Sequence, residues 1–314
     1  MAGIWVLSEQ RSTLLELIGE GRKIADALGA PLTAVVIDAR ETAVDAMAYG
    51  ADGALLLTLP AGQPLETAAA TLADLAKQAE PEIILVGATL RAKDLAARLA
   101  AKLGAGLSTD ATNLRLENGQ LVIDRMVFGG GGVSTQVVTS KPQIASVPPR
   151  TFPAPAQDPR VGEVREVTVP ADARVKIVER RTKAAEGVDI AEAQAVVGVG
   201  RGLANKADIA MAEELAAVLN GAVGCTRPVA EDLGYLPEDR YIGISGRKIA
   251  PAVYIGVAAS GQVQHVAGIK DAKVVVAINK DENAPLFKYA DYGLVGDAYQ
   301  IVPALTAELK KLLG

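Results

Sequence analysis

Hydrophobic and polar positions alternate at two different spacings along the first hundred residues. Four short apolar runs, GIWVLSE, LTAVVID, GALLLTL and EIILVGAT, are separated by amphipathic segments. These segments lie near residues 12–28, 42–49, 65–79 and 91–104. Short apolar runs that alternate with helical patterns are typical of βαβ units, whose parallel strands are buried on both faces. The pattern predicts an open, mostly parallel sheet flanked by helices.

The pattern changes between residues 107 and 148. Strand-like pieces follow one another closely there, and Asn118-Gly119 separates LRLE from QLVIDRMV. Both residues tolerate positive φ, which a tight hairpin requires. This part predicts an antiparallel extension of the first sheet. The proline-rich stretch at residues 147–159 favours extended chain, so we expect a surface crossing and no helix.

A second α/β alternation follows. Two further strand-like pieces, VREVTVP and VKIVERR, come first, and the polar segment at residues 182–189 is typical of a joint between domains. Beyond it, AVVGVG, AVGCTR, VYIGVAAS, VVVAIN and YGLVGD predict strands, while residues 205–219 and the final ALTAELKKLLG predict helices. The sequence thus predicts an α/β protein of two domains, residues 1–185 and residues 186–314, each built on an open, mostly parallel sheet.

Composition narrows the classes of function. With 314 residues, 50% hydrophobic and 22% charged, the chain is long enough to bury two cores. A formal net charge of −5 offers no basic field for nucleic acid. No apolar run reaches the roughly 18 residues of a membrane span, and the N-terminus has no cleavable leader pattern. We therefore expect a soluble, cytoplasmic protein that neither binds nucleic acid nor inserts into a membrane.

The chain has one cysteine, Cys225, and one histidine, His265. One cysteine forms no internal disulfide, and a single histidine excludes metal sites built from several histidines. No nucleophile stands in a G-x-S-x-G elbow, and the order of a catalytic triad is absent. We therefore expect no metal centre and neither hydrolase nor transferase chemistry.

Glycine-adjacent polar residues follow two of the predicted strands. Gly198-Val-Gly200-Arg201-Gly202 has the spacing G-x-G-x-G, which is neither the Rossmann fingerprint nor a P-loop, so by itself it is equally an ordinary turn with a solvated arginine. Gly224-Cys225-Thr226-Arg227-Pro228 places a hydroxyl and a guanidinium after the next strand, where the alternative is a surface salt bridge.

The same pattern recurs in three further places. Tyr241-Ile242-Gly243-Ile244-Ser245-Gly246-Arg247, with two glycines flanking a serine, suits close backbone approach to a planar ligand, or an ordinary turn. Ser260-Gly261-Gln262-Val263-Gln264-His265 combines a hydroxyl, a glycine and three hydrogen-bonding side chains where a strand gives way to a helix, although a lone histidine is more often structural. Asn279-Lys280-Asp281 and Asp297 each follow a later strand. Because ligands of open α/β sheets lie beyond the carboxyl ends of the strands, these loops together predict a large, nucleotide-like ligand.

Taken together, these loops resemble the alpha subunit of electron-transferring flavoproteins. The resemblance rests on GRGL at residues 200–203, GCTRP, the run YIGVAASGQVQHVAGIKDAKVVVAINKDENAPLF and ADYGLVGD. The first domain, with AYGAD at residues 48–52 and FGGGG at residues 128–132, is similar to the same subunit. The resemblance implies FAD in the second domain and a heterodimer with a beta subunit that carries AMP or a second FAD.

The resemblance also implies which side chains hold the FAD. Arg227 would lie near the isoalloxazine ring, Ser245 would donate toward N5, and His265 would donate to the N1/O2 edge, where charge accumulates on the reduced flavin. Ser260 would address the pyrophosphate. The full expected set is Arg201, Thr226, Arg227, Gly243, Ile244, Ser245, Ser260, Gly261, Gln262, Gln264, His265, Asn279, Asp297 and Ala298.

The implied function is electron transfer between a flavin dehydrogenase, such as an acyl-CoA dehydrogenase, and a second redox partner. Many members that serve a membrane quinone reductase carry Gln-Thr where this chain has Ile244-Ser245. The form seen here resembles the branch of NADH-dependent, electron-bifurcating complexes, and any enzymatic activity would then belong to the complex. The alternatives are a conventional non-bifurcating carrier, and a self-contained nucleotide-binding enzyme that shares the C-terminal fold.

Overall fold

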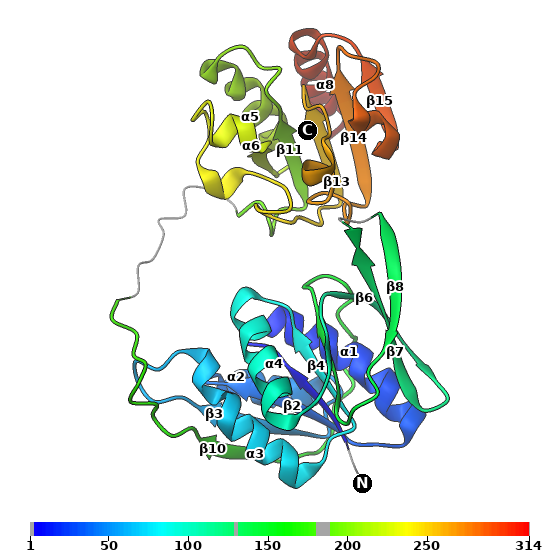
Figure 1. Ribbon diagram of the computed structural model, residues 1–314. Coiled ribbons are helices and arrows are strands. Elements are labelled where there is room, and N and C mark those ends of the chain that lie inside the picture. The colour runs from blue at the N-terminus through cyan, green and yellow to red at the C-terminus, as the bar shows by residue number, and fades with distance from the viewer. Residues whose placement is uncertain (1–2, 129–130, 180–188, 314) are drawn as a thin grey trace. The chain divides into compact units, whose positions relative to one another are not determined.

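The chain forms two compact units, Met1–Arg181 and Thr182–Gly314, each with its own sheet (Figure 1). The computed structural model describes residues 3–128, 131–179 and 189–313. Both units are α/β, which confirms the predicted fold class. The predicted domain boundary at residue 185, and all of the predicted polar joint except its last residue, lie outside the described residues.

The first unit is built on a seven-stranded parallel sheet with the order β10-β3-β2-β1-β4-β9-β5. Successive residues of β1 face opposite cores: Ile4 and Val6 pack with helices α1 and α2, while Trp5 and Leu7 pack with α3 and α4. The strands are β1 (Ile4–Leu7), β2 (Leu32–Ile37), β3 (Gly53–Thr58), β4 (Ile83–Gly87), β5 (Leu107–Ser108), β9 (Gln143–Val147) and β10 (Val164–Thr168). The helices are α1 (Arg11–Leu28), α2 (Arg40–Ala48), α3 (Ala69–Ala79), which follows a 3-10 turn at Leu65–Ala68, and α4 (Leu90–Leu103).

The predicted antiparallel strands are present, but they form a sheet of their own. Strands β6 (Ala111–Glu117), β7 (Gln120–Val127) and β8 (Gly132–Val137) pair only in the order β6-β7-β8. The hairpin at Asn118-Gly119 is confirmed, with φ of 51° and 75°. Leu114 and Ile123 pack into the core beneath α1, so this hairpin is held by its buried face and not by pairing with the larger sheet. The expectation that it extends the first sheet was therefore wrong.

Two predictions for the end of the first unit had different outcomes. Residues 147–159 contain no helix, as expected. The piece VREVTVP becomes β10, which pairs with β3 at the edge of the sheet. Of VKIVERR, the described residues 175–179 form no strand. Val178 is exposed there, while the Val175 amide donates to the Asp172 carbonyl at 3.2 Å and the Ile177 amide donates to the Gly62 carbonyl at 2.7 Å.

The second unit has a five-stranded parallel sheet with the order β12-β11-β13-β14-β15. From β11 the chain goes to one side to form β12 and then crosses to the other side to form β13, so the strand order reverses between β11 and β13. Such a switch point opens a crevice at the carboxyl ends of the strands. The strands are β11 (Ala195–Val199), β12 (Ala222–Cys225), β13 (Val253–Val257), β14 (Val274–Asn279) and β15 (Tyr292–Val295).

The helices of this unit pack on both faces of the sheet. One core includes residues of α5 and α8, and a second core on the opposite face contains Val266 of α7. Helix α8 begins six residues before the predicted start. Pro303, which directly precedes the predicted helix, lies inside α8. The helices are α5 (Ile209–Val218), α6 (Arg227–Ala230), α7 (Val263–Val266) and α8 (Ala298–Leu313), with 3-10 turns at Lys206–Asp208, Glu238–Arg240 and Pro285–Tyr289.

Within the described ranges, no helix is both long and apolar enough to cross a bilayer. The same residues contain no group of three or more histidine, cysteine or acidic side chains that could hold a metal ion.

Candidate functional site

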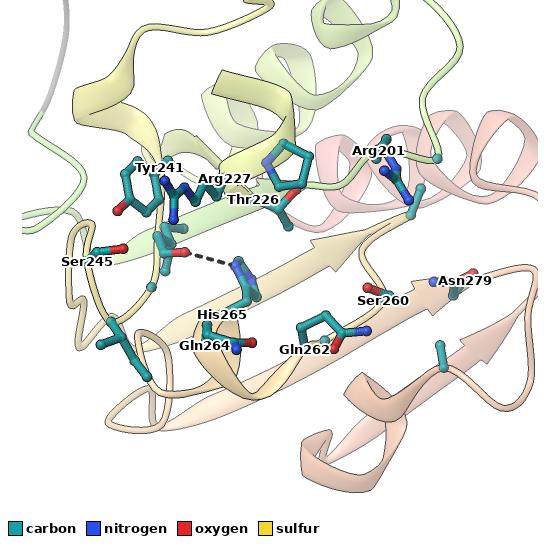
Figure 2. A pocket seen from close by; sticks show the side chains of 18 of the residues that line it. Arg201, Thr226, Arg227, Tyr241, Ser245, Ser260, Gln262, Gln264, His265 and Asn279 are labelled. Carbon is teal, nitrogen blue, oxygen red and sulfur yellow. Dashed lines mark hydrogen bonds between the residues drawn. The ribbon is translucent and has the colours of Figure 1, made fainter. Parts of the chain in front are cut away.

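A cavity of about 610 Å³ lies at the carboxyl ends of the strands of the second unit. Its walls come from the loops after β11, β12, β13 and β14 and from the loop at residues 241–247 (Figure 2). Twelve of the fourteen predicted residues line it: Arg201, Thr226, Arg227, Gly243, Ile244, Ser245, Ser260, Gly261, Gln262, Gln264, His265 and Asn279. The structure therefore brings together side chains that are separated by up to 78 residues of sequence.

The floor of the cavity depends on close backbone contact between the ends of β11 and β13. The Gly200 amide donates to the Val257 carbonyl at 2.8 Å, and the Gly202 amide donates to the Ala258 carbonyl at 3.2 Å. A Cβ on Gly200 would lie 2.2 Å from the Ala258 oxygen, which is too close for any side chain. The glycine spacing that was weak as a motif is thus required by the crossing of two loops, and it carries Arg201 to the rim.

The loop at residues 241–247 forms one wall and is fixed by backbone bonds on two sides. The Ile242 amide donates to the Cys225 carbonyl at 2.8 Å, and the Ile244 amide donates to the Gln264 carbonyl at 2.9 Å. These bonds attach the loop to β12 on one side and to α7 on the other. They leave the side chains of Ile244 and Ser245 exposed at the cavity.

Charged and polar groups are spread along the cavity. Figure 2 shows Tyr241, Arg227 and Ser245 at one end and Arg201, Ser260 and Asn279 at the other, with His265 between them. The charged side chains in the lining are Arg201, Arg227 and Asp281, so arginines outnumber acids. Such a lining favours an elongated, anionic ligand with a planar part.

Arg227 is paired with a carboxylate of its own helical turn. Its Nε donates to Glu231 Oε2 at 2.6 Å, and this contact raises the pKa of Arg227 above its ordinary value. The Arg227 side chain is 63% exposed, so solvent screens the pair strongly. Arg227 therefore forms the surface salt bridge that was the alternative interpretation of the sequence, and it also lines the cavity.

Asn279 links two of the loops. Its amide nitrogen donates to the Ala259 carbonyl at 2.9 Å, and its Oδ1 accepts the Asp281 amide at 3.0 Å. Both ends of this side-chain amide are therefore used within the protein. Asn279 holds the loops after β13 and β14 in place, and it borders the cavity at the same time.

His265 is 5% exposed and borders the cavity, but both of its ring nitrogens have partners inside the protein. Nδ1 lies 3.1 Å from the Ile242 carbonyl oxygen, and Nε2 lies 2.7 Å from the Tyr254 hydroxyl. Burial lowers the pKa of His265 to about 4, so the ring is neutral near pH 7. A neutral imidazole has one N–H, and here it is donated to Ile242. The donation to a flavin that the resemblance implied for His265 stays a prediction.

Two predicted residues lie outside the cavity lining. Asp297 is exposed at the end of β15, where its Oδ1 accepts the Tyr299 amide at 3.0 Å and caps α8. Ala298 is buried in the core that includes residues of α5 and α8. Strand β15 is the outermost strand of the sheet, so its end is farthest from the switch point.

Seven lining residues lie outside the predicted set. Tyr241, Ile242, Pro228 and Gly202 are neighbours of predicted residues, so the same loops pointed to them. Ala258, which takes a positive φ of 52°, and Ala284 give no sequence signal, because alanine is not typical of either role. The additional lining residues are Gly202, Pro228, Tyr241, Ile242, Ala258, Asp281 and Ala284.

The cavity has no nucleophile paired with a base. Cys225 is buried behind the lining, and burial raises its pKa to about 12, so its thiol stays protonated. His265 has no free nitrogen with which to act as a general base. The arrangement is suited to holding a ligand and shaping its electrostatic surroundings.

Comparison with known proteins gives consistent results over the whole chain. Residues 4–172 match the model of the electron transfer flavoprotein domain, and residues 189–270 match that of the electron transfer flavoprotein FAD-binding domain. A putative electron transfer flavoprotein subunit, YdiR, of Escherichia coli K12 is 40% identical, with 98% of each chain covered.

Two further relatives cover nearly the full length. Protein FixB of Clostridium saccharobutylicum is 38% identical over 99% of this chain and 97% of its own. The electron transfer flavoprotein subunit alpha of Thermoanaerobacterium thermosaccharolyticum is 37% identical over 98% of both chains.

Proposed function

The chain belongs to the alpha subunits of the electron transfer flavoproteins, and from this premise we propose that it binds FAD in the cavity of its second unit and transfers electrons as part of a heterodimer. The observation that carries the proposal is the single cavity that gathers two arginines and the polar ends of four strands. The chemistry that FAD supplies when bound is the uptake and release of electrons.

The residues of the cavity have the chemistry that FAD requires. Arg227 and Ser245, at one end, would hold the ring system, and Arg201 and Ser260, at the other, would hold the phosphate groups. A cation near a flavin favours its reduced, more negative form, so Arg227 would raise the reduction potential. The crossing at Gly200 fixes the loop that carries Arg201, since a Cβ at this position would collide with the Ala258 carbonyl.

Electrons would come from a flavin dehydrogenase and leave to a second redox partner. We propose that the complex belongs to the NADH-dependent, bifurcating branch, in which the beta subunit carries a second FAD in place of AMP. The supporting observation is that Ile244-Ser245, the pair in which this chain differs from many conventional carriers, borders the cavity, with Ile244 51% exposed. A cytoplasmic location is part of the same proposal.

The test is to co-express the chain with its beta subunit, purify the heterodimer, and quantify FAD and AMP. An FAD content near zero would contradict the proposed function. Adding NADH without oxygen then separates the branches. Two FAD per heterodimer and bleaching of the flavin absorbance support bifurcation. One FAD with AMP and no response to NADH would identify a conventional carrier, and nucleotide-dependent activity of the chain without its partner would favour a self-contained enzyme.

A further inference from the structure

One peptide group connects the loop that carries Arg201 with two tyrosines from other elements. The Ala204 amide donates to the Tyr299 hydroxyl oxygen at 2.8 Å, and the Tyr235 hydroxyl donates to the Ala204 carbonyl at 3.1 Å. Tyr299 lies in the first turn of α8, and Tyr235 lies shortly after the end of α6. Both tyrosines lie outside the cavity lining, so any effect that they have on a ligand passes through the loop that they hold.

The Tyr299 hydroxyl uses its hydrogen and a lone pair at the same time. It donates to Asp208 Oδ2 at 2.6 Å, and the same carboxylate oxygen accepts the Asn205 amide at 2.8 Å. The hydrogen bonds from Tyr299 and from the Asn205 amide lower the pKa of Asp208 below its ordinary value, so the carboxylate is ionised near pH 7. Because the Tyr299 hydroxyl donates to a charged group, a lone pair is left to accept the Ala204 amide.

The start of the same loop is fixed by backbone contacts. The amides of Gly200 and Gly202 donate to the end of β13 and the loop that follows it, and Arg201 lies between these two glycines. Ala204 attaches the chain again two residues later. The stretch at residues 200–208 is therefore connected to the end of β13 by its glycines, to the segment after α6 by Tyr235, and to α8 by Tyr299.

The position of the Arg201 guanidinium depends on the backbone that carries it. Arg201 is exposed, and among the described residues it has no carboxylate partner, whereas Arg227 pairs with Glu231. Arg201 lies with Ser260 and Asn279 at one end of the cavity (Figure 2). A guanidinium without a carboxylate partner keeps its planar fork of donors for an anion, and this fork matches the oxygens of a phosphate group. Where the loop lies therefore decides whether the cation reaches such a ligand.

Tyr235 also connects the two loops that carry the arginines of the cavity. Its amide donates to the Val229 carbonyl at 3.0 Å, within α6, and the first residue of α6 is Arg227. Its hydroxyl holds the loop of Arg201 through the Ala204 carbonyl. Hydrogen bonds of one residue thus link the backbone beneath the two cations, which lie at opposite ends of the cavity.

We propose that Tyr235 and Tyr299 are positioning residues that hold Arg201 at its end of the cavity before a ligand binds, so that the site is preorganised for the diphosphate group of a dinucleotide. This inference rests on the proposed function. A loop that is already in its binding position loses no affinity to ordering, whereas a loop that samples other positions binds more weakly in proportion to the time it spends there.

The test measures the affinity of the heterodimer for FAD, by titrating the flavin-free complex and following flavin fluorescence. Tyr299→Phe keeps the ring and removes both bonds of the hydroxyl, so FAD is expected to bind about tenfold more weakly. Tyr235→Phe removes one bond and should weaken binding about threefold. Tyr292→Phe is the matched control, because Tyr292 is exposed on β15 and lies outside the cavity lining.

A double-mutant cycle with Arg201→Ala separates positioning of the arginine from a general effect on the fold. In the Arg201→Ala background the tyrosine substitutions should cause no further loss, because the side chain that they position is gone. Arg201→Ala also identifies the flavin of the cavity if the beta subunit carries a second one. Wild-type affinity in the folded tyrosine variants, or equal losses with and without Arg201, overturns the proposal. If Tyr299→Phe does not fold, Tyr235→Phe decides.

Hydrogen exchange followed by mass spectrometry tests the contacts of the loop without flavin. Peptides that include Ala204 and Asn205 are expected to exchange about three- to tenfold faster in Tyr299→Phe than in wild type and in Tyr292→Phe. Equal exchange in all three would contradict the proposal whether or not FAD is bound. The two proposals therefore fail separately, since a complex that shows the expected exchange but holds no FAD contradicts the proposed function alone.

Discussion

At the scale of single residues, the charge that the cavity presents depends on a carboxylate outside its lining. Glu231 accepts from Arg227 at 2.6 Å and lies one helical turn further along the chain. It partly compensates the cation that would lie beside the flavin. Both side chains are accessible to solvent, so the compensation is weakened by salt.

Glu231→Gln removes this negative charge and leaves Arg227 in place. The flavin midpoint potential is expected to rise, because an uncompensated cation favours the reduced form, and Arg227→Ala is expected to lower it. The measurement is a redox titration of the heterodimer at low and high salt, with both effects smaller at high salt. Glu214→Gln is the control, since Glu214 pairs with Lys310 away from the cavity. Equal potentials in wild type and Glu231→Gln would show that the pair does not act on the flavin.

His265 makes the stability of the second unit depend on pH. The unfolded chain takes up a proton below the ordinary histidine pKa of about 6.5, whereas the folded ring stays neutral down to about 4. Stability contributed by the neutral ring is thus fully present above about pH 6.5 and is lost as pH falls toward 4. The expected loss is roughly 3 kcal/mol.

The measurement is urea unfolding at several pH values, followed by circular dichroism. Trp5, the only tryptophan, is buried in the first unit. Its fluorescence therefore reports the unfolding of the first unit, and the other transition in the circular dichroism curve is assigned to the second unit. In His265→Gln the stability of the second unit should depend less on pH between about 4 and 6.5 than it does in wild type. The same slope in both chains would mean that His265 is not the responsible group.

At the scale of elements, the start of α8 shows how one side chain can serve a helix. Asp297 precedes the helix, and its carboxylate accepts the amide of Tyr299, the second residue of α8. A side-chain oxygen at this position satisfies an amide that has no partner within the helix. The tyrosine that donates this amide also donates its hydroxyl to Asp208 at 2.6 Å, which connects α8 with the turn before α5.

Asp297→Ala is expected to destabilise the second unit by about 1 kcal/mol, because the cap is lost. Asp297→Asn keeps an oxygen in the same place and should retain most of that stability. Urea unfolding of both variants measures the difference. Equal losses would indicate that the carboxylate acts through its charge and not as a cap. The FAD content of the purified heterodimers, measured alongside, tests the flavin contact that the resemblance implied for Asp297.

At the scale of the whole molecule, the two units have separate hydrophobic cores. Leu85 lies at the centre of the first unit's sheet and Ile255 at the centre of the second's, and both are buried. Leu85→Ala is expected to destabilise the first unit by about 2–5 kcal/mol through the lost contacts and the cavity left behind. Trp5 fluorescence should report this loss while the second transition stays in place.

Ile255→Ala is the matched variant in the second unit, and it should destabilise the second unit while leaving the first unchanged. The dichroism transition of the second unit is expected at lower urea, with Trp5 fluorescence unchanged. If either substitution moves both transitions together, the units unfold as one cooperative structure and the separate cores do not act independently.

The periodic parts of the fold could be predicted, and most of the site with them. Alternating apolar runs and amphipathic segments indicated the strands and helices of both sheets, because burial on both faces demands that pattern. The hairpin at Asn118-Gly119 followed from backbone preferences. The helix start at Ala298 was not predicted. Proline is usually found in the first turn of a helix, whereas Pro303 lies deeper inside α8.

The chain by itself determined the class of fold, the loops that form the cavity and the family to which the protein belongs, since these depend on local pattern and on motifs that can be read in order. Only the tertiary structure decided which side chains share the cavity, that Gly200 is required by a loop crossing, and that Asp297 caps a helix. It also decided the state of His265. Tyr254 lies eleven residues before the histidine, on a strand that gives no polar signal, and only burial brings its hydroxyl to the ring and keeps that ring neutral.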